Sequence, residues 1–235
     1  MRKTIVSMAL LAAVLFLVSP AQADIIQTQY FGPSIPDYSA TLTFNKYNGS
    51  VSDLTAIIIE LSLTSTGGLG QVDNESLSTA TVHVEFGTSG YLFSTDVLLP
   101  SNLANPLSPL KTITAADFVL GPNDGDGIGV DVGGADYNQL VGATDTVSSI
   151  GNVLSTTFGM YVGAGTFDIS GIISTYLSVT GASGISQGTT PQNAEGFVKV
   201  TYRTAGGVPE PGTMLLMASA LGGLAAWRRR RRNAA

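Results

Sequence analysis

Apolar and polar residues alternate along two stretches of the chain, 81–86 ("TVHVEF") and 196–203 ("GFVKVTYR"). Alternation with a period of two is the pattern of a β-strand with one face in a core and the other in water. The positions expected to face the core are Val82, Val84, Phe86, Val198, Val200 and Tyr202. His83 and Glu85 are expected to share the opposite, wet face.

Other short runs of β-branched and aromatic residues are separated by Gly, Ser, Asn and Pro, which predicts further strands and turns. These runs are 39–44, 54–63 and 166–179, the last expected to form two strands that meet at Gly171. No sustained 3.6-residue period occurs between residues 24 and 207. We therefore predict one all-β domain over 24–207, an antiparallel β-sandwich of about eight to ten strands, jelly-roll-like or immunoglobulin-like. A β-solenoid is the alternative, although the sequence has no repeat of fixed period.

The first 23 residues have the pattern of a secretory signal peptide. Arg2 and Lys3 precede an apolar run over 5–18, which Pro20 and the small-residue triplet 21–23 follow. Signal peptidase is expected to cut after Ala23, with Ala21 and Ala23 as its recognition residues. An N-terminal membrane anchor is the alternative, but the run is shorter than the roughly 20 apolar residues of a typical span.

The last 28 residues, 208–235, contain three parts in order. Val208-Pro209-Glu210-Pro211 is followed by the uncharged stretch 212–227 and then by five consecutive arginines. We predict a short transmembrane helix over 212–227 with the arginines on the cytoplasmic side, so the domain lies outside. An ordinary permanent anchor explains the helix and the arginines, but not the two prolines, which keep the preceding backbone extended and accessible to an enzyme.

These three parts resemble the PEP-CTERM sorting signal of Gram-negative bacteria. The resemblance implies that an exosortase, a membrane-embedded cysteine transpeptidase, processes the chain during export. The expected recognition residues are Val208, Pro209, Glu210 and Pro211, and the residues expected to set the topology are Arg228, Arg229, Arg230, Arg231 and Arg232. A eukaryotic lipid-anchor signal is disfavoured because its hydrophobic tail does not normally end in a strongly basic block.

Charge and cysteine usage exclude several classes of function. Residues 24–207 contain 16 acidic and four basic side chains, a net charge of −12, whereas the whole chain has −6. Such a domain repels nucleic acid, so we expect no nucleic-acid partner. The chain has no cysteine, which excludes disulfides, thiol catalysis and thiolate metal sites.

The body of the chain is also similar to a family. The stretches that carry the resemblance are "QTQYFGPSIPDYSATLTFNKYN" (27–48), "ELSLTSTGG" (60–68), "VEFGTSGYLFSTDV" (84–97) and "GAGTFDI" (163–169). They resemble the choice-of-anchor E domain, an exported bacterial module found with differing C-terminal anchors. That family has no defined biochemical function, so the resemblance implies an architecture and no catalytic residues.

The glycine-rich stretch 121–136 contains four aspartates, Asp124, Asp126, Asp131 and Asp136. Ca²⁺ takes six to eight oxygen ligands in tolerant geometry, so Asp124, Asp126 and Asp131 are candidate ligands. An EF-hand starting at Asp124 fails at Ile128 and Ala135, and a glycine-rich Ca²⁺ repeat matches only in part. The alternative is that 121–136 is a solvated acidic loop that binds no metal. In that case we expect the protein to have no cofactor.

No catalytic constellation is identifiable. His83 is the only histidine and is expected to be solvated, and no Gly-x-Ser-x-Gly motif accompanies it. The sequence therefore favours an exported, non-catalytic surface or matrix protein, structural or adhesive and associated with exopolysaccharide. It would begin as an inner-membrane precursor after signal peptidase and the secretion machinery have acted. The alternative is a secreted carbohydrate-active enzyme that uses carboxylates and carries the same sorting signal.

Overall fold

A computed structural model describes residues 24–125 and 127–205, and within them the protein is all-β with antiparallel sheets. The strands are β1 (Ile25–Ser34), β2 (Tyr38–Asn45), β3 (Leu54–Thr66), β4 (Leu69–Asn74), β5 (Ala80–Phe93), β6 (Leu110–Leu120), β7 (Tyr137–Val141), β8 (Asp145–Asn152), β9 (Thr166–Thr180), β10 (Ile185–Thr190) and β11 (Asn193–Thr204). Two short 3₁₀ helices, η1 (Val51–Asp53) and η2 (Ser155–Tyr161), join strands.

The described strands form a β-sandwich-like arrangement of two faces. One face is the sheet β2-β9-β5-β6, and the other is the sheet β1-β11-β3-β8, which the sheet β10-β4-β7 continues. Three strands of the second face are interrupted once: β3 continues as β4 after 67–68, β7 as β8 after 142–144, and β10 as β11 after 191–192, whereas β1 has no continuation. The interruptions lie together, since Gly142 N–H donates to the Gly68 carbonyl at 3.0 Å. Gly67 and Gly68 have φ of +73° and +76°, which glycine adopts without strain.

Two hydrophobic cores fill the space between the faces. The larger core draws on both four-stranded sheets, and it includes Phe44, Ile57, Ile59, Leu61, Leu63, Phe167, Ile169, Val198, Val200 and Tyr202. The smaller core lies beneath β10-β4-β7, and it contains Val72, Val82, Val84, Phe86, Leu120 and Leu140. Near the interruptions, at the boundary between the two cores, several polar side chains are buried. They include Thr88, Thr112 and Gln192.

The alternation predicted from the sequence is confirmed. All six residues expected to face the core at 81–86 and 196–203 are at most 1% exposed. One prediction is wrong: residues 166–180 form a single strand, and Gly171 does not divide it. Gly171 pairs with Ala40 of β2 on one side and with Leu92 of β5 on the other, so two ladders hold the backbone extended through the glycine. The named strand pairings are antiparallel, so the solenoid alternative does not hold.

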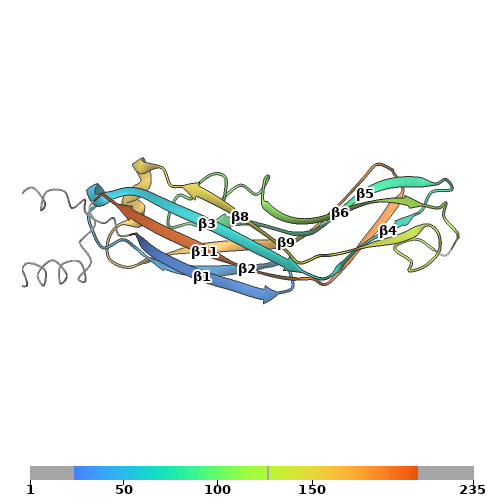
Figure 1. The fold of residues 1–235 in the computed structure, drawn as a ribbon, viewed down its shortest axis with the longest axis horizontal. Coiled ribbons are helices and arrows are strands. Elements are labelled where there is room, and N and C mark those ends of the chain that lie inside the picture. The colour runs from blue at the N-terminus through green and yellow to red at the C-terminus, as the bar shows by residue number, and fades with distance from the viewer. Residues whose placement is uncertain (1–23, 126, 206–235) are drawn as a thin grey trace, which may run out of the picture.

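The molecule is long, and the ends of its described chain meet at one end of it (Figure 1). Ile25 at the start of β1 pairs with Tyr202 near the end of β11, and Arg203 Nε lies 3.4 Å from Asp24 Oδ2. The acidic stretch 121–136, which joins β6 to β7, lies at the opposite end (Figure 1). The described chain therefore ends, at residue 205, at the opposite end of the domain from the acidic stretch.

The predicted signal peptide (1–23) and the predicted transmembrane helix (212–227) lie outside the described residues. Across 24–125 and 127–205, no helix has the length and apolar character needed to cross a bilayer.

Candidate functional site

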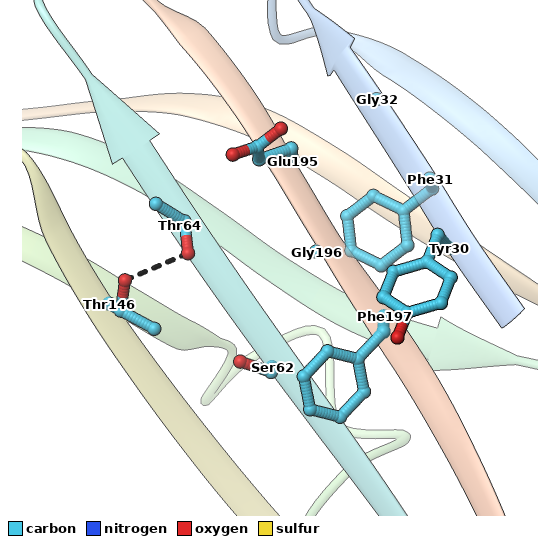
Figure 2. A pocket seen from close by; sticks show the side chains of 9 residues that line it. All are labelled: Tyr30, Phe31, Gly32, Ser62, Thr64, Thr146, Glu195, Gly196 and Phe197. Carbon is cyan, nitrogen blue, oxygen red and sulfur yellow. Dashed lines mark hydrogen bonds between the residues drawn. The ribbon is translucent and has the colours of Figure 1, made fainter. Parts of the chain in front are cut away.

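A hollow of about 320 Å³ lies on the outer face of the sheet β1-β11-β3-β8. Its floor forms where β11 passes through Gly196, which pairs with Phe31 of β1 and Leu63 of β3. A Cβ at Gly196 would lie only 2.6 Å from Phe31 Cζ, so a side chain does not fit there. The glycine lets Phe31, otherwise a core residue, reach the floor of the hollow (Figure 2).

Two aromatic rings form one side of the hollow (Figure 2). Tyr30 and Phe197 are directly paired across β1 and β11, with ring centroids 6.0 Å apart in an edge-to-face arrangement. Tyr30 is 75% exposed, so one face of its ring is open to water beside the half-buried Phe197. Lys199 Nζ lies 5.9 Å from the Phe197 centroid and forms an ion pair with Glu60.

Polar side chains form the other side. Cross-strand pairing places Glu195 beside Thr64, and Thr64 beside Thr146. The hydroxyl oxygens of the two threonines are 2.8 Å apart and hydrogen-bonded (Figure 2). Within the described part of the chain, the exposed carboxylate of Glu195 has no ion-pair partner, so it is available to accept hydrogen bonds from a ligand.

This combination suits a ring that is apolar on its faces and hydroxylated at its rim. Exposed aromatic rings provide rigid apolar surface, and a few fixed polar groups provide orientation. A pyranose has both properties, because its C–H groups form an apolar face and its hydroxyls donate and accept at the edge. Glu195 is the single carboxylate lining the hollow, whereas hydrolysis of a glycosidic bond ordinarily uses two.

His83 lies on a different surface, the outer face of β5 and β6. Its Nδ1 is 2.7 Å from Asp117 Oδ1 and its Nε2 is 3.8 Å from Glu85 Oε1. The hydrogen bond to Asp117, helped by the charges of both carboxylates, raises the pKa of His83 above its usual value of 6.5. Among the described residues, both ring nitrogens therefore face carboxylates, whereas a Ser-His-Asp triad directs one nitrogen at a hydroxyl.

Asp117 is 34 residues from His83 in the sequence, and only the β5–β6 register reveals that the two lie opposite each other, so sequence spacing does not single it out. The expected wet position of His83 is confirmed, since its side chain is 46% exposed.

The acidic stretch is folded around two buried carboxylates that are not among the three candidate Ca²⁺ ligands. Asp136 Oδ2 accepts from the Asp124 N–H at 2.9 Å, and Asp73 Oδ2 accepts from the Asp131 N–H at 2.8 Å. Asp126 lies outside the described residues. In 24–125 and 127–205, no group of three or more His, Asp or Glu side chains is arranged to hold a metal ion. The site of Asp124, Asp126 and Asp131 therefore stays a prediction.

Comparison with known proteins identifies the end of the chain. Residues 207–231 match the family model of the PEP-CTERM protein-sorting motif. A motif of this kind implies an exported, membrane-anchored precursor that an exosortase processes. The matched segment includes every residue predicted for recognition and four of the five predicted arginines, and it lies outside the described residues. The similarity of the body to the choice-of-anchor E domain stays a prediction.

None of the curated proteins compared with this chain matches it. Among solved structures, one similar chain belongs to the structure of infectious bursal disease virus Gx strain, at 13% identity and a TM-score of 0.17. The alignment covers 81% of this chain and 33% of the viral one, so this chain spans about a third of that protein's length. A likeness this weak carries no argument about function.

Proposed function

We propose that this protein is an exosortase substrate that is delivered to the outer surface or the extracellular matrix, where its β-domain binds exopolysaccharide without cleaving it. The observation that carries the proposal is the sorting motif at 207–231. In this proposal, signal peptidase removes residues 1–23, the helix over 212–227 holds the precursor in the inner membrane, and exosortase acts near Val208 to Pro211.

The position of the chain ends supports this order of events. Asp24, the first residue expected in the mature protein, is paired with Arg203, and the sorting motif begins four residues after Arg203. The described chain therefore begins and ends close to one end of the domain (Figure 1). In this proposal, the end of the sandwich that carries the acidic stretch points away from the membrane that holds the precursor.

The binding role rests on the chemistry of the hollow. Tyr30 and Phe197 offer an apolar platform, and Glu195, Thr64 and Thr146 offer hydrogen-bonding groups beside it. A single lining carboxylate supports binding in preference to hydrolysis.

Affinity electrophoresis of the full-length chain in gels containing the host's exopolysaccharide tests the binding role. We expect the protein to be retarded and Tyr30→Ala to weaken the apparent affinity at least about fivefold, since one aromatic contact contributes roughly 1 kcal/mol. Phe93→Ala is the matched control, because Phe93 is an aromatic side chain that is 53% exposed and does not line the hollow. Equal retardation of both variants and the parent would contradict a role for the hollow.

The same samples test the enzyme alternative. Incubation with the polymer should release no reducing ends. Release that Glu195→Gln abolishes would instead establish a carboxylate-dependent hydrolase.

A further inference from the structure

We propose that the end of the sandwich remote from the chain termini holds one Ca²⁺ ion between the carboxylates of Asp124 and Asp136. This inference does not depend on the saccharide hollow or on the sorting motif. It differs from the candidate set predicted from the sequence in its partner for Asp124: the Asp136 carboxylate accepts from the Asp124 main-chain N–H, whereas the Asp131 main-chain N–H donates to the Asp73 carboxylate.

The first observation is a buried carboxylate oxygen of Asp136 that has no hydrogen-bond partner among the described residues. Asp136 immediately precedes β7 and is 1% exposed. Its Oδ2 accepts from the Asp124 N–H, but its buried Oδ1 has no hydrogen-bond partner within the described residues. A buried charged oxygen without a partner is costly, and buried charges are ordinarily paired or bound to metal.

The direction of that oxygen is the second observation. Asp136 Oδ1 and Asp124 Oδ2 both face Gly134, and a Cβ built on Gly134 would lie 2.5 Å or less from each of them. Two carboxylate oxygens therefore border one small space, which a side chain at position 134 would fill. Two ionised carboxylates so placed repel each other, and either a shared proton or a cation between them relieves the repulsion.

The surroundings of the pair are negative, and in the described part of the chain no basic side chain forms an ion pair with it. Asp73 is 3% exposed, and Glu75 is close enough for the charge of Asp136 to act on its pKa. Within the described part of the chain, none of the four ion pairs involves either of these acids or the Asp124–Asp136 pair. No Lys or Arg occurs in the sequence between Lys111 and Lys199.

The geometry favours Ca²⁺ over Mg²⁺. Ca²⁺ accepts an irregular set of carboxylate, carbonyl and water oxygens at 2.3–2.6 Å, whereas Mg²⁺ demands a near-ideal octahedron. Two side chains supply only part of the shell, and Gly134 is exposed, so water has access to the rest. Sites of this kind in extracellular modules bind with Kd of about 10⁻⁴–10⁻³ M.

Thermal unfolding of the full-length chain in a mild detergent, with EGTA or with 10 mM CaCl₂, tests the site. At that concentration, binding to the folded state alone should raise Tm by about 3–10 °C. Asp136→Asn should abolish the rise, and it should leave Tm in EGTA equal or higher because the repulsion with Asp124 is removed. Asn keeps an oxygen that accepts from the Asp124 N–H, so the local fold has the same hydrogen bond available.

Asp117→Asn is the matched control. It removes one negative charge from an exposed strand position, so it reproduces any general effect of salt on an acidic protein. We expect it to keep the full Ca²⁺ response. An equal response in Asp136→Asn and Asp117→Asn, or no response in the parent chain, would overturn the proposal.

A second readout covers the case in which Asp136→Asn does not fold. Tyr137 directly follows Asp136, so Tb³⁺ bound at the site should show tyrosine-sensitised luminescence that CaCl₂ quenches by displacement. Asp124→Asn, a change at an exposed residue, should remove this signal. Undiminished luminescence in Asp124→Asn would also overturn the proposal.

Discussion

The side-chain amide of Gln192 donates a hydrogen bond to the main-chain oxygen of Gly87 across the interior of the sandwich. Gln192 lies in the interruption between β10 and β11, and Gly87 lies in the uninterrupted strand β5. The bond therefore ties the broken face to the continuous face near the boundary between the two cores. Gln192 is only 3% exposed, so its amide has no ready access to water in place of this partner.

We expect Gln192→Ala to lower the free energy of unfolding by about 1–3 kcal/mol, because it removes a buried hydrogen bond and leaves a space beside Gly87. Chemical denaturation followed by circular dichroism measures the change. Gln187→Ala, at an exposed position of β10, is the control and should have little effect. A cost no greater than that of the control would show that the amide does not hold the two faces together.

The pairing of His83 with Asp117 predicts a pH dependence. The hydrogen bond to Asp117 raises the pKa of His83 in the folded protein above the 6.5 of the unfolded chain. The resulting stability is fully present below pH 6.5 and is lost as pH rises through the raised folded pKa. The effect should be small, because the side chain is largely exposed.

The chain has a single histidine, so one imidazole resonance reports the pKa of His83 directly by NMR titration. Asp117→Asn should bring this pKa back toward 6.5. A titration midpoint that Asp117→Asn leaves unchanged would mean that the pair does not persist in solution.

From two buried tyrosines in the larger core we predict how the stability of the protein falls at alkaline pH. Burial raises the pKa of Tyr161 and Tyr202 far above the usual 10. Each hydroxyl also donates to a main-chain oxygen, that of Leu98 for Tyr161 and that of Asn45 for Tyr202. Because the folded pKa is raised, this contribution to stability is present below pH 10 and is lost as pH rises beyond it.

We therefore expect the absorbance of tyrosinate near 295 nm to rise in a late step that coincides with the loss of circular dichroism. Tyr202→Phe should shrink that step and, by removing a hydrogen bond, lower the free energy of unfolding by about 1 kcal/mol. Complete ionisation of all eight tyrosines in a protein that stays folded would contradict the prediction.

The residue pattern was sufficient to predict the fold class and the inward faces of β5 and β11. It was insufficient where pairing partners decide the outcome. Gly171 suggests a break when the sequence is considered alone, but the ladders with β2 and β5 hold it in one strand. The interruption at 67–68 aligns with those at 142–144 and 191–192 only after three distant strands have paired.

The candidate sites also differ in whether the sequence alone reveals them. The sorting motif is contiguous, so its residues are recognisable without a structure, and the match at 207–231 supports it. The hollow joins Tyr30, Thr64, Thr146 and Glu195 from four strands, and no spacing along the chain reveals it. Asp136 was visible as one acid among several, but its burial depends on contacts made by the folded β6–β7 connection.

Replacement of Pro209-Glu210-Pro211 by alanines tests the sorting proposal. Without the prolines, the backbone before the predicted helix is free to become helical and loses the extended form that a peptidase binds. We expect the full-length chain, 24–235 after signal-peptide removal, to accumulate in the inner membrane. Intact mass spectrometry of membrane and extracellular fractions, in hosts with and without exosortase, measures the outcome.

Alanines at Gly206 and Asn233, which flank the matched segment, are the control and should leave processing unchanged. Normal processing of the triple-alanine variant would remove the motif as the recognised element, and mature protein that retains Arg228 to Arg232 would identify the tail as a permanent anchor.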